Sequence, residues 1–170
     1  MITNKQYLEG ALSTATYPQH TILGHNYVSL GLSGEAGEVC DKVKKLIRDK
    51  NWDGMHIEAI AKEDRHSIIL ELGDVLWYCY IWHYERFGDN NPMNNDEPLP
   101  KSIYGYKDLC ISASLLANAA SNEDIKRCIG MISHIAYLLD SDIQEVARLN
   151  LEKLDSRKSR NKISGSGDDR

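Results

Sequence analysis

Two short stretches of this sequence carry paired carboxylates at a spacing that suits a metal ion. The stretch GEAGEV contains Glu35 and Glu38, and the stretch ELGDV contains Glu71 and Asp74. Residues three apart lie on one side of an α-helix, so each pair can direct two carboxylates at the same point. Hard oxygen ligands, with no cysteine and no paired histidine among them, favour Mg²⁺ or Mn²⁺ over zinc. We therefore predict a Mg²⁺ site held by these four acids, with Mn²⁺ as a substitute.

The apolar residues around the four acids recur with the period of an α-helix. Glu35 falls inside the apolar stripe of its segment and Glu38 lies at its edge, while Glu71 and Asp74 flank the second stripe. Burying carboxylates without compensation costs several kcal/mol per ion, and a divalent cation removes most of that cost. The stripe residues are Val28, Leu32, Ala36, Val39, Val43 and Leu46 in the first segment, and Ile68, Leu72, Val75, Leu76, Cys79 and Trp82 in the second.

Glycine recurs beside both acidic pairs. Gly31, Gly34 and Gly37 are spaced every three residues in the first segment, and Gly73 lies between the two acids of the second. A glycine inside a helix costs about 1 kcal/mol relative to alanine. We therefore expect the backbone to come close to another helix or to a ligand at these positions.

A solvated acidic face is the alternative interpretation of the first segment. Glu38 and Lys42, and likewise Asp41 and Lys45, stand four apart and can form ion pairs along an exposed helix. Two acidic pairs on neighbouring segments, each beside an apolar stripe and a glycine, favour the metal site over this interpretation.

Basic residues near the C-terminus offer partners for an anion. Asn150, Lys153 and Arg157 are spaced so that they share one helical face, and lysine and arginine are the usual partners of phosphate oxygens. Lys45 is a further candidate. Residues 148–170 contain seven basic and four acidic side chains in a chain whose net charge is −5, so the rest of the chain is acidic. That distribution suits a metal-plus-phosphate site, although a solvated helix is the alternative.

The residues that would contact a nucleobase are less sharply indicated. Trp77 and Tyr78 follow the second acidic pair and can either stack on a base or belong to the core. His20, His25 and Asn26 can either contact a base or sugar, or cap a helix and lie on the surface.

The elements that must position these side chains are helices, since no segment alternates as a strand does. We predict an all-α fold, an antiparallel helical bundle, with residues 1–160 forming a single domain and 161–170 a flexible tail. Residues 88–105 hold three of the four prolines and are expected to form a loop that joins the two halves of the bundle. The predicted helices span residues 4–16, 22–49, 57–87, 107–120, 122–139 and 141–159.

The cysteines and the hydropathy pattern indicate the cellular setting. Cys40, Cys79, Cys110 and Cys128 are scattered without a CxxC pair, which favours reduced thiols in a cytoplasmic protein. The longest apolar run, 75–82, is far shorter than the roughly 20 residues of a membrane span, and the first residues do not resemble a secretion signal. We expect no membrane partner.

The two acidic stretches also resemble a known family. GEAGEV, followed about thirty residues later by ELGDVLWY, resembles the MazG-like, all-alpha nucleoside triphosphate pyrophosphohydrolases, whose signature is E-E-x-x-E and then E-x-x-D on neighbouring helices. Glu35 and Glu38 match the last two acids of the first motif, and Glu71 and Asp74 match the second. The later segment RLNLEKLDSRKSR resembles the same family as well. Gly34 stands where the family has the first acid of this motif. Any metal ligand or structural support that this acid provides in the family is therefore missing here.

This resemblance implies a reaction and assigns roles to residues. The reaction is Mg²⁺-dependent hydrolysis of a nucleoside triphosphate between the α- and β-phosphates, giving the monophosphate and pyrophosphate in nucleotide-pool control or house-cleaning. Glu35 or Glu38 would orient or deprotonate the attacking water. Residues 83–131 look inserted relative to the most compact members of the family, which leaves the packing of the C-terminal helices open.

Other functions are compatible with parts of the pattern. A phosphoribosyl-ATP or dUTP hydrolase would use the same metal site on another substrate. A non-catalytic helical interaction module would carry the acids as a solvated or metal-structured face. The net charge of −5 argues against nucleic-acid binding. The partners that we expect are a nucleoside triphosphate and further copies of this chain, in a homodimer or homotetramer that completes the core.

Overall fold

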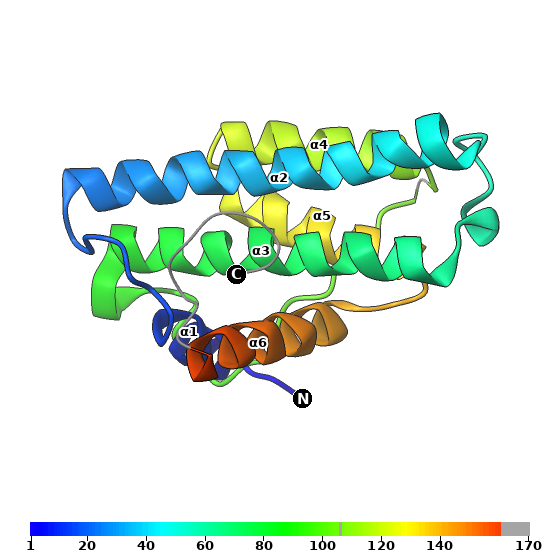
Figure 1. Cartoon of the computed structure of the whole chain (residues 1–170). Coiled ribbons are helices and arrows are strands. Elements are labelled where there is room, and N and C mark those ends of the chain that lie inside the picture. The colour runs from blue at the N-terminus through cyan, green and yellow to red at the C-terminus, as the bar shows by residue number, and fades with distance from the viewer. Residues whose placement is uncertain (106, 161–170) are drawn as a thin grey trace.

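The computed structural model describes residues 1–105 and 107–160 of the chain, and over these residues the fold is all-helical (Figure 1). Within these ranges there is no strand, and Thr3 and Pro98 form an isolated β-bridge. The predicted all-α fold is thus confirmed. The elements are α1 (Asn4–Leu12), α2 (Ile22–Lys50), the 3₁₀ helix η1 (Ile57–Ala59), α3 (Lys62–Phe87), the 3₁₀ helix η2 (Gly88–Asn90), α4 (Leu109–Ser121), α5 (Ile125–Leu138) and α6 (Ile143–Ser159).

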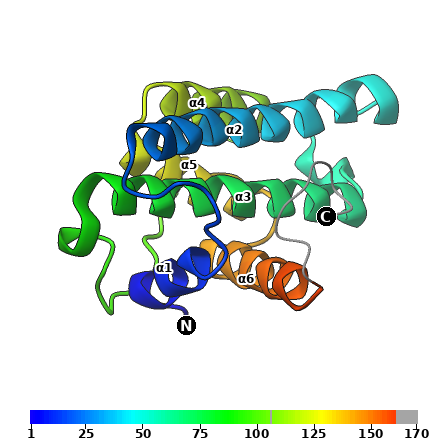
Figure 2. The same cartoon turned by 60° about the vertical axis from the view of Figure 1, so that its left-hand side comes forward.

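Helix α3 is the centre of the arrangement because it contacts α1, α2, α5 and α6. The two long helices α2 and α3 run side by side in opposite directions, with α4 and α5 covering them on one side (Figures 1 and 2). Helices α1 and α6 pack together on the other side of α3. Of the helices in the described ranges, none is both long enough and apolar enough to cross a bilayer.

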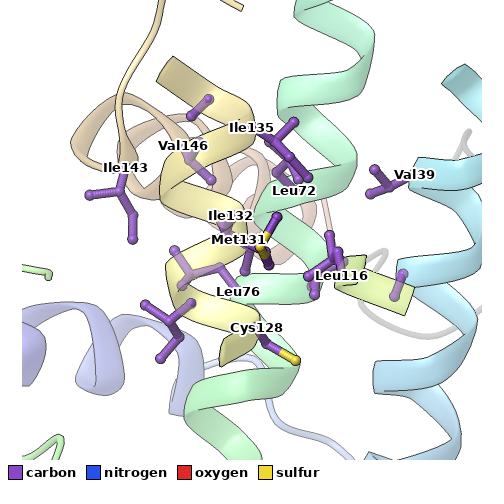
Figure 3. Close-up of a cluster of buried hydrophobic side chains, with 14 of the residues drawn as sticks. Val39, Leu72, Leu76, Leu116, Cys128, Met131, Ile132, Ile135, Ile143 and Val146 are labelled. Carbon is purple, nitrogen blue, oxygen red and sulfur yellow. The ribbon is translucent and has the colours of Figure 1, made fainter. Parts of the chain in front are cut away.

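The hydrophobic core lies between α3 and the helices around it. Side chains from α2 to α6 meet in one cluster, which includes Val39, Leu72, Leu116, Ile132 and Val146 (Figure 3). Both predicted apolar stripes face inward: every stripe residue of α2 is buried, and so is every one of α3 except the half-buried Trp82. The stripes therefore fix the rotation of both helices about their axes, and with it the direction in which the acidic pairs point.

The predicted helix over 57–87 is in fact interrupted. Ile60 is extended and separates η1 from α3, which begins at Lys62. Arg65 explains the break, because its guanidinium donates hydrogen bonds to the carbonyl oxygens of Ile57 and Ile60, both at 2.9 Å. The buried side chain of Ile60 anchors the same turn.

The first predicted helix also ends early, at Leu12 rather than at Thr16. The hydroxyls of Ser13 and Thr14 donate to the carbonyl oxygens of Gly10 and Ala11, at 2.8 and 2.9 Å. Such local side-chain bonds compete with helix continuation. The residues that follow Leu12 form the connection to α2 and one wall of a cavity.

The loop predicted over 88–105 contains η2, and α4 begins at Leu109, capped by Asp108, rather than at residue 107. The loop is tied to the start of α1, since the N–H groups of Asn4 and Lys5 donate to the carbonyl oxygens of Glu97 and Asn95 at 2.8 and 2.9 Å. The predicted tail, 161–170, lies outside the described residues.

The glycines beside the acids divide into two kinds. A Cβ atom at Gly31 would lie 2.2 Å from the Tyr78 ring, and one at Gly73 would lie 2.9 Å from Cβ of Asn150 on α6. The expected close approach to another helix is therefore found at these two positions. Gly34 and Gly37 face open space instead, with no atom within 4 Å of an added Cβ.

This difference predicts opposite effects of the same substitution. Gly37→Ala adds a methyl group in open space and should raise the free energy of unfolding by about 0.5–1 kcal/mol, because alanine favours the helix. Gly73→Ala should lower it by about 1–3 kcal/mol, because the methyl group collides with α6. Urea denaturation of both variants measures the change in the free energy of unfolding. Equal effects of the two substitutions would contradict the packing described for Gly73.

Candidate active site

A cavity of about 430 Å³ lies where α2, α3 and α6 meet the connection between α1 and α2. Its size falls within the range of small-molecule sites. All the residues predicted from the sequence to form the site line it, except Asn150, which is bonded to one of them. The lining residues are Thr14, Thr16, Tyr17, Tyr27, Glu35, Glu38, Lys42, Lys45, Glu71, Asp74, Trp77, Tyr78, Lys153, Leu154 and Arg157.

Three of the four predicted metal ligands converge on one point. Carboxylate oxygens of Glu35, Glu71 and Asp74 lie within 4.8 Å of one another, and all three side chains are half-buried. Glu38 lies outside this group; it is exposed and borders the cavity one turn further along α2. Three hard oxygen donors at this separation fit Mg²⁺ or Mn²⁺, and the like charges make a cation favourable there.

Glu71 forms a salt bridge across the interface between α2 and α3. Its carboxylate lies 3.3 Å from Nζ of Lys42, and the Glu71 side chain is only 13 % exposed. Burial raises the pKa of Glu71, and the nearby Lys42 ammonium opposes this rise. The solvated-face interpretation pairs Lys42 with Glu38 instead. The better signal was the spacing of seven residues between Glu35 and Lys42, which places both on one face of α2.

Asp74 is held by two side chains of α6. Nδ2 of Asn150 donates to one carboxylate oxygen at 3.1 Å, and Nζ of Lys153 lies 2.5 Å from the other. The predicted phosphate-binding face of α6 therefore reaches the acidic group directly. Its third member, Arg157, also lines the cavity, and the Arg157 side chain makes no hydrogen bond or ion pair with any residue in the described ranges.

Tyr7 on α1 supports this arrangement from behind, although no sequence pattern around Tyr7 indicates this role. Its hydroxyl donates to Oδ1 of the buried Asn150 at 2.7 Å, so a chain of hydrogen bonds runs from Tyr7 through Asn150 to Asp74. Burial raises the pKa of Tyr7, which keeps the phenol neutral and able to donate. The close approach at Gly73 is what lets α6 bring Asn150 this near.

Lys45 is already paired. Its ammonium lies 2.5 Å from Asp41, which raises the pKa of Lys45, and Asp41 also pairs with Lys44. This is one of the two ion pairs that the solvated-face interpretation proposed. Lys45 still borders the cavity and is exposed, so it can reach a ligand there only by leaving Asp41.

Aromatic side chains also line the cavity. Trp77 is 9 % exposed, and its indole N–H donates to Ala11 O at 3.1 Å and to Oγ1 of Thr14 at 3.3 Å, so it serves mainly as wall. The rings of Tyr17 and Tyr27 are stacked, with centroids 5.3 Å apart.

The three polar residues that the sequence analysis considered near a base or sugar lie elsewhere. His20, His25 and Asn26 do not belong to the lining. The backbone N–H of His20 donates to Glu85 at 2.9 Å, and the His25 ring packs near Trp82.

The chain is similar to a known family over the two helices that carry the acids. The family model of the MazG nucleotide pyrophosphohydrolase domain matches residues 24–85, which include all four acids. The chain is also 32% identical, over 168 residues, to the "Gene 37 protein" of Mycobacterium phage L5, and the match covers 96% of each chain. No solved structure gives a significant match.

Replacing Tyr7 by phenylalanine tests the hydrogen-bond chain behind Asp74. Tyr7→Phe leaves the buried Oδ1 of Asn150 unpaired and should cost about 1–3 kcal/mol of unfolding free energy. Because Asn150 orients Asp74, the variant should also need about tenfold more Mg²⁺ for the same rise in melting temperature.

Tyr80→Phe is the matched control. The Tyr80 hydroxyl is also buried and donates to Oδ1 of Asn4 at 2.5 Å, outside the cavity. Its loss should cost similar stability and leave the Mg²⁺ dependence unchanged. An identical Mg²⁺ response in the two variants would show that Tyr7 does not act on the acidic group.

Proposed function

The chain belongs to the MazG nucleotide pyrophosphohydrolase family, and on that premise we propose that it hydrolyses nucleoside triphosphates to the monophosphate and pyrophosphate with Mg²⁺. The observation that carries the proposal is the convergence of Glu35, Glu71 and Asp74 in a cavity that also presents Lys153 and Arg157. Oxygen ligands beside cationic side chains are what a magnesium-bound polyphosphate requires. Removal of damaged or surplus nucleotides is the role that we propose for this reaction.

The three converging carboxylates are the proposed ligands of Mg²⁺, with Mn²⁺ as a substitute. Bound there, the ion would neutralise charge on the phosphate oxygens as the α–β bond breaks. Asn150 keeps Asp74 oriented, and Lys42 balances Glu71 within the same interface. The chain itself thus fixes the ligands before substrate arrives, which is the condition for electrostatic stabilisation of a transition state.

Glu38 is the residue that we propose for the attacking water. Its carboxylate lies outside the converging group, is exposed and borders the cavity, so it can hold a water and accept its proton. Glu35 is the alternative base, although a role as ligand occupies its carboxylate. Arg157 would bind the phosphates that leave as pyrophosphate, and Lys153 would do so on leaving Asp74.

The rival interpretations differ from this proposal in what they require of the cavity. A non-catalytic interaction module has no need of three half-buried carboxylates within 4.8 Å of one another, whose mutual repulsion a bound cation would relieve. A phosphoribosyl-ATP or dUTP hydrolase would use the same carboxylates, and assays with those substrates separate it from a general triphosphate hydrolase.

Removing one carboxylate of the converging group tests the reaction class. Glu71→Gln and Asp74→Asn should each lower Mg²⁺-dependent pyrophosphate release by more than about hundredfold, because a ligand is lost. Glu63→Gln, a change of an exposed glutamate at the start of α3, should leave the rate unchanged. The assay uses a panel of ribo- and deoxyribonucleoside triphosphates, with EDTA as the metal-free control. No release from any triphosphate by the folded wild type would refute the proposed function.

A second prediction concerns the phosphate-binding side of the cavity. Arg157→Gln should raise KM for the triphosphate by about tenfold or more, because a charged hydrogen bond to phosphate is lost. Lys158→Gln removes a neighbouring exposed charge of α6 and serves as the control for net charge. If both variants raise KM equally, Arg157 acts only through the overall charge of the helix.

A further inference from the structure

Two lysines of the cavity pair with carboxylates of the converging group. Nζ of Lys153 lies 2.5 Å from Oδ2 of Asp74, and Nζ of Lys42 lies 3.3 Å from Oε1 of Glu71. Both lysines line the cavity, where the side chain of Lys153 is 25 % exposed and that of Lys42 is 29 % exposed. Two of the three proposed metal ligands are therefore paired with a cation of the chain itself.

The two carboxylate oxygens of Asp74 have different partners. Oδ1 accepts a hydrogen bond from Nδ2 of the buried Asn150 at 3.1 Å, whereas Oδ2 pairs with Lys153. Because Tyr7 fixes Asn150, the amide can keep Oδ1 while the lysine moves. A metal ion that binds Asp74 through its other oxygen takes the atom that Lys153 holds. The ion and the ammonium group thus compete for one ligand atom.

The formal charges of the cluster lead to the same conclusion. Three carboxylates and two ammonium groups leave a formal charge of −1, so the cluster attracts Mg²⁺ only weakly while both lysines stay in place. A triphosphate brings several negative charges, and its oxygens are strong acceptors for an ammonium group. The nucleotide therefore offers both lysines a new partner at the moment when the metal ion takes the old one.

Lysine suits such a change of partner better than arginine would. Its ammonium group is a compact charge with three donors on a flexible stem, and it needs no fixed planar geometry. Lys42 and Lys153 line the same cavity as Arg157, the proposed phosphate ligand. An ammonium group that leaves its carboxylate therefore stays in the cavity that the phosphates would enter.

We infer that Lys42 and Lys153 couple the binding of the metal ion to the binding of the nucleotide. They hold the carboxylates until Mg²⁺ displaces them, and they then bind the phosphates. Mg²⁺ alone binds weakly, because only the phosphates give both ammonium groups a new partner. The coupling is reciprocal, so the nucleotide raises the affinity for the ion by the same factor as the ion raises the affinity for the nucleotide. This inference rests on the proposed function and specifies how its site is regulated.

The first test is the affinity of the protein for Mn²⁺ alone, with the free ion counted by electron paramagnetic resonance. Lys42→Met and Lys153→Met keep the stem but remove the charge, and each should bind Mn²⁺ about tenfold more tightly than the wild type. Lys44→Met on α2 and Lys158→Met on α6 are the matched controls, since both lysines are exposed and neither lines the cavity. The controls should change the affinity by less than about twofold.

This titration separates competition for the carboxylates from a structural role of the ion pairs. If the lysines only orient the carboxylates, Lys42→Met and Lys153→Met should weaken Mn²⁺ binding, because the ligands lose their support. If only net charge matters, the two controls should strengthen Mn²⁺ binding as much as the cavity variants do. Either result would overturn the inference. The titration involves no turnover, so it is independent of the proposed reaction.

The second test follows the ammonium groups of the wild type, so it does not depend on how the variants fold. Nitrogen-15 spectra of the lysine ammonium groups are recorded with Mg²⁺, and then with Mg²⁺ and α,β-methylene ATP, which cannot be cleaved at the α–β position. We expect the Lys153 signal to gain a coupling to phosphorus in the second spectrum, because its hydrogen bond passes from Asp74 to a phosphate. A Lys153 signal that does not change when the analogue binds would overturn the inference.

The two tests together distinguish this inference from the proposed function. If the analogue does not bind, the proposed function fails and the transfer of the lysines to phosphate fails with it. If the analogue binds and is accompanied by hydrolysis of triphosphates, but the Lys42 and Lys153 variants bind Mn²⁺ no more tightly than the wild type, the coupling fails and the proposed function stands.

Discussion

Mutual repulsion among Glu35, Glu71 and Asp74 is the constraint around which the rest of this structure is arranged. Their carboxylate oxygens lie within 4.8 Å of one another between two long helices. The apolar stripes of α2 and α3 fix this position, because turning either helix to separate the acids would expose its buried face. The core thus holds together like charges that would otherwise move apart, and the energy of packing maintains an acidic cluster that could bind a cation.

Helices α6 and α1 provide the groups that offset the repulsion among these carboxylates. Asp74 receives a hydrogen bond from Asn150 and an ion pair from Lys153, and Tyr7 holds Asn150 in place. Gly73 permits the close contact between α3 and α6 on which these bonds depend. The same helix carries cations at the cavity, so one element both stabilises the acids and faces the expected phosphates.

Helical periodicity was sufficient to predict the two buried stripes and the direction of the acidic pairs, because these depend on spacing within one helix. Contacts between elements distant in sequence were not predictable in this way. Tyr7 lies 143 residues from its partner Asn150, and Lys42 pairs with Glu71 across a helix interface rather than with Glu38 along its own helix. The break at Ile60 likewise depends on the Arg65 side chain, which donates hydrogen bonds to two backbone carbonyl oxygens. The amino-acid composition does not reveal these bonds.

The central claim is that the three converging carboxylates hold a metal ion against the phosphates of a nucleotide. The most direct measurement is an anomalous difference map from crystals grown with Mn²⁺ and an α,β-imido nucleoside triphosphate. We predict a manganese peak bounded by Glu35, Glu71 and Asp74, in contact with phosphate oxygens of the bound nucleotide. A nucleotide bound in the cavity with manganese absent from these carboxylates, or manganese at another set of acids, would contradict the claim.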